Sequence, residues 1–224
     1  MAVAELAYRY RTPSAVRCDA GRSEVLLGTS GGVTEAGPEQ HPYFFKGFLA
    51  EPGPAAAGML ACAAVARARY HTPASVIAAA VADPVVTSNG DRLRFESFSG
   101  CCGVHARLDL LPDALTEQPV RSGSTNVDFN EGMRAALGGA AVRGPLLLSV
   151  GADEVAVTTL AASATERKVA LPERWLKGFG EVQALARDMR LVAELAGAEA
   201  QRFTRGVPRN ARRPLWAVPG GRGP

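Results

Sequence analysis

The segment from Val85 to Glu96 restricts the fold of this chain more than any other stretch of its 224 residues. Asn89-Gly90 can adopt the positive φ angles of a type I′ turn, and the residues beyond it alternate between apolar and polar with a period of two. The segment therefore predicts a β-hairpin. Val104–Leu111 alternates in the same way and predicts a further strand.

Proline and apolar spacing predict helices on both sides of this hairpin. Pro52 and Pro54 open the segment Ala55–Arg69, and proline is favoured in the first turn of a helix. Pro172 opens the strongest amphipathic pattern. Its apolar stripe, which is expected to lie in the core, consists of Trp175, Phe179, Val182 and Ala186. A last short helix is expected over Ala198–Arg205.

The remaining elements are predicted from shorter signals. Tyr8–Val16 and Ser23–Leu27 are expected to form two strands closed by a turn at Gly28–Gly32. Asp128 is expected to be the N-cap of a short helix, with Glu131 at the reciprocating position of a capping box. A three-stranded meander is expected from Leu146–Val150, Val155–Leu160 and Glu166–Leu171.

Strands and helices are interspersed, and several strand pairs are hairpins, which favours an α+β class over a parallel sheet. We expect antiparallel hairpins and a meander packed with three to four helices. Residues 1–208 are expected to form a single domain, with a subdivision near residue 140 left open. Residues 209–224 are rich in arginine, proline and glycine and are expected to form a flexible tail.

The net charge and the N-terminal sequence restrict the partners and the cellular compartment expected for the chain. The net charge of +3 is too small to imply a nucleic-acid partner. The N-terminus has no basic start followed by an apolar core, and the longest apolar run, Ala55–Ala66, is far shorter than the roughly 20 residues that span a bilayer. The four cysteines are irregularly spaced. We therefore expect a cytoplasmic protein with reduced thiols and no membrane partner.

Gly28–Gly32 matches the G-x-S-x-G pattern of hydrolases, with Ser30 at the nucleophile position. That chemistry requires a helix directly after the serine, which holds the strained turn and directs amides at an oxyanion. Val33–Pro38 follows instead and does not resemble a helix start. The pattern predicts an ordinary turn.

Cys101, Cys102 and His105 form the most reactive-looking cluster, because a thiolate needs a nearby base or cation. In an extended segment Cys102 and His105 would point to opposite faces. Structural zinc normally takes two separated pairs of ligands. A second pair is not provided by Cys18, Cys62, His41 or His71. We therefore assign no catalytic, cofactor-binding or metal-binding residue, and a cysteine-dependent enzyme at Cys101 or Cys102 remains an alternative.

The stretch Arg94–Pro112, RFESFSGCCGVHARLDLLP, resembles a group of actinobacterial SWIM zinc finger family proteins. Four further stretches fit the same resemblance: His41–Leu49, Thr125–Asp128, Val150–Thr159 and Leu171–Gln183. The family carries its C-x-C…C-x-H zinc site farther toward the C-terminus. This chain contains no such motif and no cysteine after Cys102. The resemblance thus implies the N-terminal region of such a protein, truncated before the finger, and carries zinc or nucleic-acid contacts onto no residue.

Together these observations predict a non-enzymatic interaction or scaffold module with a protein partner. Tyr43, Phe44, Phe45 and Phe48 are the first candidates for a partner surface, with a place in the core as the alternative. A nucleic-acid-associated function remains an alternative, carried by arginines with no acid between them. These arginines are Arg202, Arg205, Arg209, Arg212, Arg213 and Arg222.

Overall fold

The computed structural model describes residues 7–10, 13–19, 22–68, 83–119, 121–140, 144–151, 165–168, 173–191 and 193–206. The chain divides into two units, Met1–Gly178 and Phe179–Pro224. The first unit contains the sheets and the helices packed on them. The second contains most of one helix and all of the last one.

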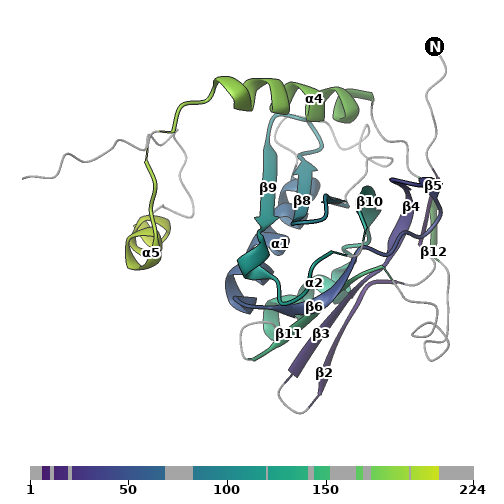
Figure 1. Cartoon of the computed structure of the whole chain (residues 1–224), viewed down its shortest axis with the longest axis horizontal. Coiled ribbons are helices and arrows are strands. Elements are labelled where there is room, and N and C mark those ends of the chain that lie inside the picture. Colours follow the sequence, from purple (N-terminus) through teal and green to yellow (C-terminus); the bar gives the residue numbers. More distant parts are fainter. Residues whose placement is uncertain are drawn as a thin grey trace, which may run out of the picture. The chain divides into compact units, whose positions relative to one another are not determined.

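The larger sheet has six strands, all paired antiparallel (Figure 1). Across the sheet the order is β5 (Gly37–Glu39), β4 (Thr29–Thr34), β10 (Gly123–Val127), β7 (Val85–Ser88), β8 (Leu93–Phe98) and β9 (His105–Leu110). The strands β7, β8 and β9 follow one another in the chain and form an antiparallel meander, so the predicted hairpin and the predicted third strand are confirmed.

The turn of this hairpin differs from the expected one. The amide of Asn89 donates to the carbonyl of Arg92 at 3.4 Å, so Gly90 and Asp91 are the two central residues. Gly90 has a φ of +86°, and Asp91 is not among the residues with positive φ. A positive φ at the first central residue alone is the type II′ pattern, which glycine adopts without strain.

The smaller sheet has four strands, in the order β2 (Ala15–Asp19), β3 (Arg22–Leu27), β11 (Leu146–Val150) and β6 (Phe45–Leu49). β11 runs parallel to β3 and antiparallel to β6. All five residues of β11 are buried, as expected for a central strand covered on both faces. A separate antiparallel pair joins β1 (Ala7–Tyr10) to β12 (Thr165–Lys168).

Gly28 alone separates β3 from β4, so one stretch of chain passes directly from the smaller sheet into the larger. The predicted turn at Gly28–Gly32 is therefore wrong, because Thr29–Thr34 is a strand paired on both sides. The predicted strand Tyr8–Val16 is also wrong as a single element. Its two ends belong to β1 and β2, which lie in different sheets.

The helices are α1 (Pro52–Arg67), α2 (Glu131–Ala140), α4 (Glu173–Asp188) and α5 (Gly197–Gly206), with a 3₁₀ turn, η2, at Pro112–Ala114. Helix α1 packs on β8 and β9. Its buried face is small, which allows close approach: a Cβ at Gly58 would lie 2.8 Å from the side chain of Leu108. The helices predicted from Pro52, Pro172 and Ala198 are confirmed.

The core lies between the two sheets and α1, and it is built on large apolar side chains. Phe44, Phe45, Phe95 and Phe129 are fully buried. Each contributes about 1.5–3 kcal/mol relative to an exposed position. Phe44 and Phe45 therefore belong to the core and not to a partner surface, while Tyr43 and Phe48 are half-buried.

Two further expectations are corrected. β11 and β12 lie in different sheets, so the expected meander over 146–171 is wrong, and Val155–Leu160 lies outside the described residues. The N-cap of α2 is Asn130 rather than Asp128, because Oδ1 of Asn130 accepts from the amide of Met133 at 2.8 Å. The α+β class itself is confirmed. Among the helices in the described part of the chain, none is long and apolar enough to cross a bilayer.

Candidate functional site

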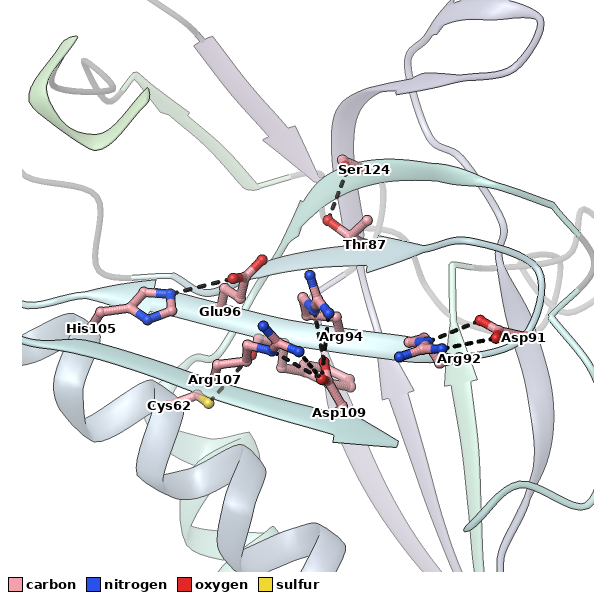
Figure 2. Close-up of polar contacts among 11 residues, drawn as sticks. Cys62, Thr87, Asp91, Arg92, Arg94, Glu96, His105, Arg107, Asp109 and Ser124 are labelled. Carbon is pink, nitrogen blue, oxygen red and sulfur yellow. Dashed lines mark hydrogen bonds and ion pairs between the residues drawn. The ribbon is translucent and has the colours of Figure 1, made fainter. Parts of the chain in front are cut away.

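Charged side chains line the face of β8 and β9 that is opposite to the face packed on α1 (Figure 2). Alternation along β8 buries Leu93 and Phe95 and places Arg94 and Glu96 on this other face. Three side chains of β9 share the face with them: His105, Arg107 and Asp109.

Asp109 is the centre of this group. Arg94 lies directly opposite it, and its Nε donates to Oδ1 of Asp109 at 2.7 Å. Arg107, two residues earlier on β9, donates from Nε to Oδ2 at 2.9 Å and from its terminal nitrogen to the same oxygen. Partial burial raises the pKa of Asp109, but the hydrogen bonds from Arg107 and Arg94 outweigh it and hold the pKa below 3.8.

Glu96 and His105 form a second pair on the same face. Nε2 of His105 lies 3.3 Å from Oε1 of Glu96. The imidazole also packs against the ring of Phe98, with ring centroids 4.8 Å apart and the two planes inclined by 43°. A carboxylate next to a histidine ring fixes its orientation, which is the role that a carboxylate has in hydrolytic triads.

The face as a whole is electrically balanced. Arg92, at the hairpin tip, donates to both oxygens of Asp91 at 3.0 Å. With Arg94 and Arg107 it makes three guanidinium groups against three carboxylates, those of Asp91, Glu96 and Asp109. A phosphate would have to compete with these carboxylates for each guanidinium. The arrangement therefore stabilises the hairpin and does not form a ready anion-binding site.

Cys101 and Cys102 lie in the tight connection between β8 and β9. The amide of Cys102 donates to the carbonyl of Ser99 at 2.8 Å, and Cys102 has a φ of +57°. Residues 102–105 are thus not extended at their start, which corrects the geometry expected from the sequence. Sγ of Cys101 lies 3.4 Å from Oγ of Ser99, and the partner seen for the imidazole of His105 is Glu96.

Cys62 lies on the opposite side of β8, between the strand and α1. Its thiol donates to the carbonyl of Phe95 at 3.7 Å, and its own carbonyl accepts from Oγ of Ser97 at 2.6 Å. Burial, with a smaller contribution from the charge of Glu96, raises the pKa of this thiol to about 11. Cys62 is therefore a packing residue and a poor nucleophile.

Ser30 is fully buried within β4 and does not lie on an exposed elbow. Its Oγ donates to the carbonyl of Gly31 at 3.3 Å, and its carbonyl accepts from Oγ1 of Thr125 at 3.0 Å. A strand residue enclosed in this way cannot present a hydroxyl to a substrate. The G-x-S-x-G match carries no hydrolase chemistry here.

A buried polar cluster at the junction of the two sheets was not predicted from the sequence. Asp83 accepts from the hydroxyl of Tyr10 at 3.1 Å and from the amide of Phe129 at 3.3 Å. Asp128 accepts from the amide of Ser14 at 3.1 Å, and Gly28 donates to Oγ of Ser14 at 2.8 Å. The cluster holds β1, the start of β2 and the end of β10 together.

Two atoms of this region are buried with no hydrogen-bond partner among the described residues, namely Oδ1 of Asp128 and Nδ2 of Asn126. No group of three or more histidine, cysteine, aspartate or glutamate side chains suited to a metal ion occurs within the same described ranges. Cys18 lies in β2, but its side chain is outside the described part, as is His71. That the chain has no metal-binding residue therefore stays a prediction.

The second unit has a surface of a different kind. Leu185, Met189 and Leu191 are exposed by 60%, 72% and 75%. Leu195 and Phe203 are exposed as well. Phe179 and Val182 of the predicted stripe are half-buried, Ala186 is exposed, and the side chain of Trp175 lies outside the described part. The apolar stripe predicted from the sequence ended at Ala186, so it did not include the apolar residues that follow.

No protein-family model, no curated protein and no solved structure matches this chain.

Proposed function

We propose that the chain is a non-enzymatic protein-interaction module, and that the helical segment from α4 to α5 presents the binding surface. The observation that carries the proposal is the exposure of five large apolar side chains between residues 185 and 203. Exposed apolar side chains that gather in one segment are typical of protein interaction sites. The five residues are Leu185, Met189, Leu191, Leu195 and Phe203.

The spacing on α4 fits one recognition mode. Val182 and Leu185 lie at positions i and i+3 of α4, which share one face of the helix, and Met189 directly follows the last helical residue, Asp188. An amphipathic helix with this spacing binds by laying its apolar face into a hydrophobic groove. Each side chain buried in this way contributes about 1.5–3 kcal/mol before the cost of ordering the segment.

The first unit supports the non-enzymatic part of the proposal. Its arginine-rich face is balanced by carboxylates, Cys62 is held as a buried thiol, and Ser30 is enclosed in a strand. These arrangements have stabilising roles that need no substrate. Among the described residues the unit presents exposed large apolar side chains only singly, at Val33, Val104 and Leu111.

The family placement and the cytoplasmic setting belong to the same proposal. What supports a SWIM-type relationship is the stretch Arg94–Pro112, which forms a continuous structural piece from β8 through β9 to the start of η2. The direct check is to read the gene beyond the codon for Pro224. A C-x-C…C-x-H motif in frame supports the placement, and a stop codon with no trace of the motif counts against it.

The test of the interaction surface is partner capture with the full chain as bait, comparing wild type with Leu185→Asp/Met189→Asp. The matched control is Gln183→Asp/Ala184→Asp, which places the same two charges on the opposite, exposed side of α4. We expect the double variant to lose captured proteins that the control retains. Because both leucine and methionine are exposed, we expect the free energy of unfolding to change by less than about 1 kcal/mol.

Two outcomes would contradict the proposal. If the double variant captures the same proteins as wild type, the surface is not used. If the double variant unfolds, Leu185 and Met189 belong to a core and not to a docking face. The capture is therefore read together with a thermal melt of all three proteins.

Two alternative functions have separate tests. A nucleic-acid-associated function predicts salt-sensitive binding that disappears when residues 209–224 are deleted. A cysteine-dependent enzyme predicts that Cys101 or Cys102 alkylates far faster than an ordinary thiol at neutral pH. The described arginines of the larger sheet give no support to the first, because carboxylates already engage them.

A further inference from the structure

β9 forms one edge of the six-stranded sheet, at its end in the strand order (Figure 1). Within the described ranges, β8 is the strand that pairs with it, and the other side of β9 faces no strand. An edge of this kind presents a row of backbone donors and acceptors to any other strand. β9 is six residues long and contains no proline, and its charged residues Arg107 and Asp109 have opposite signs, so they do not give the edge a net repulsive charge.

Two other edges of the sheets, β5 and β6, are protected. β5, at the opposite end of the larger sheet, has three residues, and its centre is Pro38. At β6 the neighbouring segment pairs with the edge: the amide of Thr116 donates to the carbonyl of Phe48 at 3.0 Å, and Leu49 forms a bridge with Leu115. Among the described residues, β9 has neither a central proline nor a segment paired along its outer side.

Side chains of opposite charge lie next to each other on β9. Arg107 lies opposite Glu96 of β8 and donates to Asp109, two residues along its own strand. Val104 and Leu111, which flank β9, are exposed by 36% and 44%. The edge thus combines a pair of opposite charges with apolar residues at both ends.

These charges are self-complementary in one antiparallel register. When two copies of β9 pair about Leu108, Arg107 of each copy lies opposite Asp109 of the other, and Ala106 lies opposite Leu110. A register centred on Arg107 or on Asp109 would place like charges opposite each other. The register centred on Leu108 also keeps the apolar residues of both copies on the same face.

We propose that two copies of this chain associate through β9, antiparallel and centred on Leu108, so that their six-stranded sheets become one continuous sheet. The association is isologous, since each copy contributes the same strand. It does not depend on α4, so it is separate from the docking surface proposed above.

The test is sedimentation equilibrium of the full chain over a concentration series. Arg107→Asp and Asp109→Arg each place like charges opposite each other twice in the dimer. We expect each to weaken self-association by about tenfold or more. An equimolar mixture of the two variants restores opposite charges at both positions, and we expect it to form a heterodimer. Leu185→Asp/Met189→Asp is the control and is expected to dimerise like wild type.

Asp109→Arg also removes the partner of Arg94, so a thermal melt must show that the variant is folded. A second measurement on wild type does not depend on it: backbone amides of residues 106–110 are expected to exchange hydrogen more slowly as protein concentration rises. A wild-type chain that stays monomeric up to about 1 mM overturns the proposal and leaves the edge to a strand of another protein. A dimer that Arg107→Asp does not weaken overturns it as well.

Discussion

Asp109 on β9 accepts a 2.7 Å hydrogen bond from Nε of Arg94, the residue directly opposite it on β8. This bond joins the last two strands at one end of the larger sheet, on the face away from α1. Because Arg107 of β9 donates to the same carboxylate, Asp109 binds a guanidinium group from each of these two strands. The consequence is a dependence of stability on the charge of Asp109.

The pKa of Asp109 is lower in the folded chain than its ordinary value of 3.8. Its contribution to stability is therefore fully present above that value and is lost as pH falls through the folded pKa. We expect Asp109→Asn to reduce the free energy of unfolding by about 1–2 kcal/mol at neutral pH. Urea unfolding at several pH values should show this difference shrinking below about pH 4. A difference that stays constant with pH would contradict the assignment.

Gly151, directly after β11, has a backbone conformation whose cost a substitution can measure. It has a φ of +90°, and a Cβ there would lie 2.5 Å from the carbonyl oxygen of Pro42. We expect Gly151→Ala to destabilise the fold by about 2–4 kcal/mol, from strain and contact together. Gly31→Ala is the matched control, because no atom lies within 4 Å of its Cβ position. Thermal melts should show a lowered midpoint for the first variant alone.

Cys62 is expected to resist alkylation in the folded chain. A pKa raised from 9.0 to about 11 lowers the thiolate fraction at neutral pH by about a hundredfold, and burial excludes the reagent as well. Timed iodoacetamide labelling followed by peptide mass spectrometry should find Cys62 modified far more slowly than Cys101 and Cys102. Labelling of Cys62 at the rate of the other two would mean that α1 does not stay packed on β8.

Asn130 tests the start of α2. Its side chain accepts from the amide of Met133 and donates to the carbonyl of Ser14 and to Asp128. We expect Asn130→Ala to lower the free energy of unfolding by about 2 kcal/mol. Glu131→Ala removes the residue that the sequence assigned to a capping box, and a change below about 1 kcal/mol is expected. A larger effect at Glu131 than at Asn130 would restore the sequence-based assignment.

Much of the fold could be predicted from local patterns in the sequence. The alternation on both sides of Asn89-Gly90 predicted β7, β8 and β9, and the prolines before Ala55 and Trp175 predicted α1 and α4. These elements depend on residues within a few positions of one another, so short windows contain the information. The turn type was missed because either Asn89-Gly90 or Gly90-Asp91 can supply the positive φ that a hairpin requires.

Contacts between distant residues could not be predicted in this way. Asp128 was interpreted as a helix cap because Glu131 follows it, yet it binds the amide of Ser14, which is 114 residues away. Asp83 and Tyr10 are 73 residues apart. For the charged face, the sequence did hold a signal: Arg94 and Glu96 alternate on β8, and Arg107 and Asp109 alternate on β9. Reading those two strands as neighbours would have predicted the ion pairs.

The central position of β11 in the smaller sheet has a consequence for how the chain folds as it is synthesised. β3 and β6 leave the ribosome early, yet the strand that separates them follows about 100 residues after Leu49. At typical synthesis rates that delay is on the order of 5–20 s. During this interval β3 and β6 have unfilled edges, and the smaller sheet cannot close. A chaperone that acts on nascent chains would therefore be expected to bind between the emergence of β6 and that of β11.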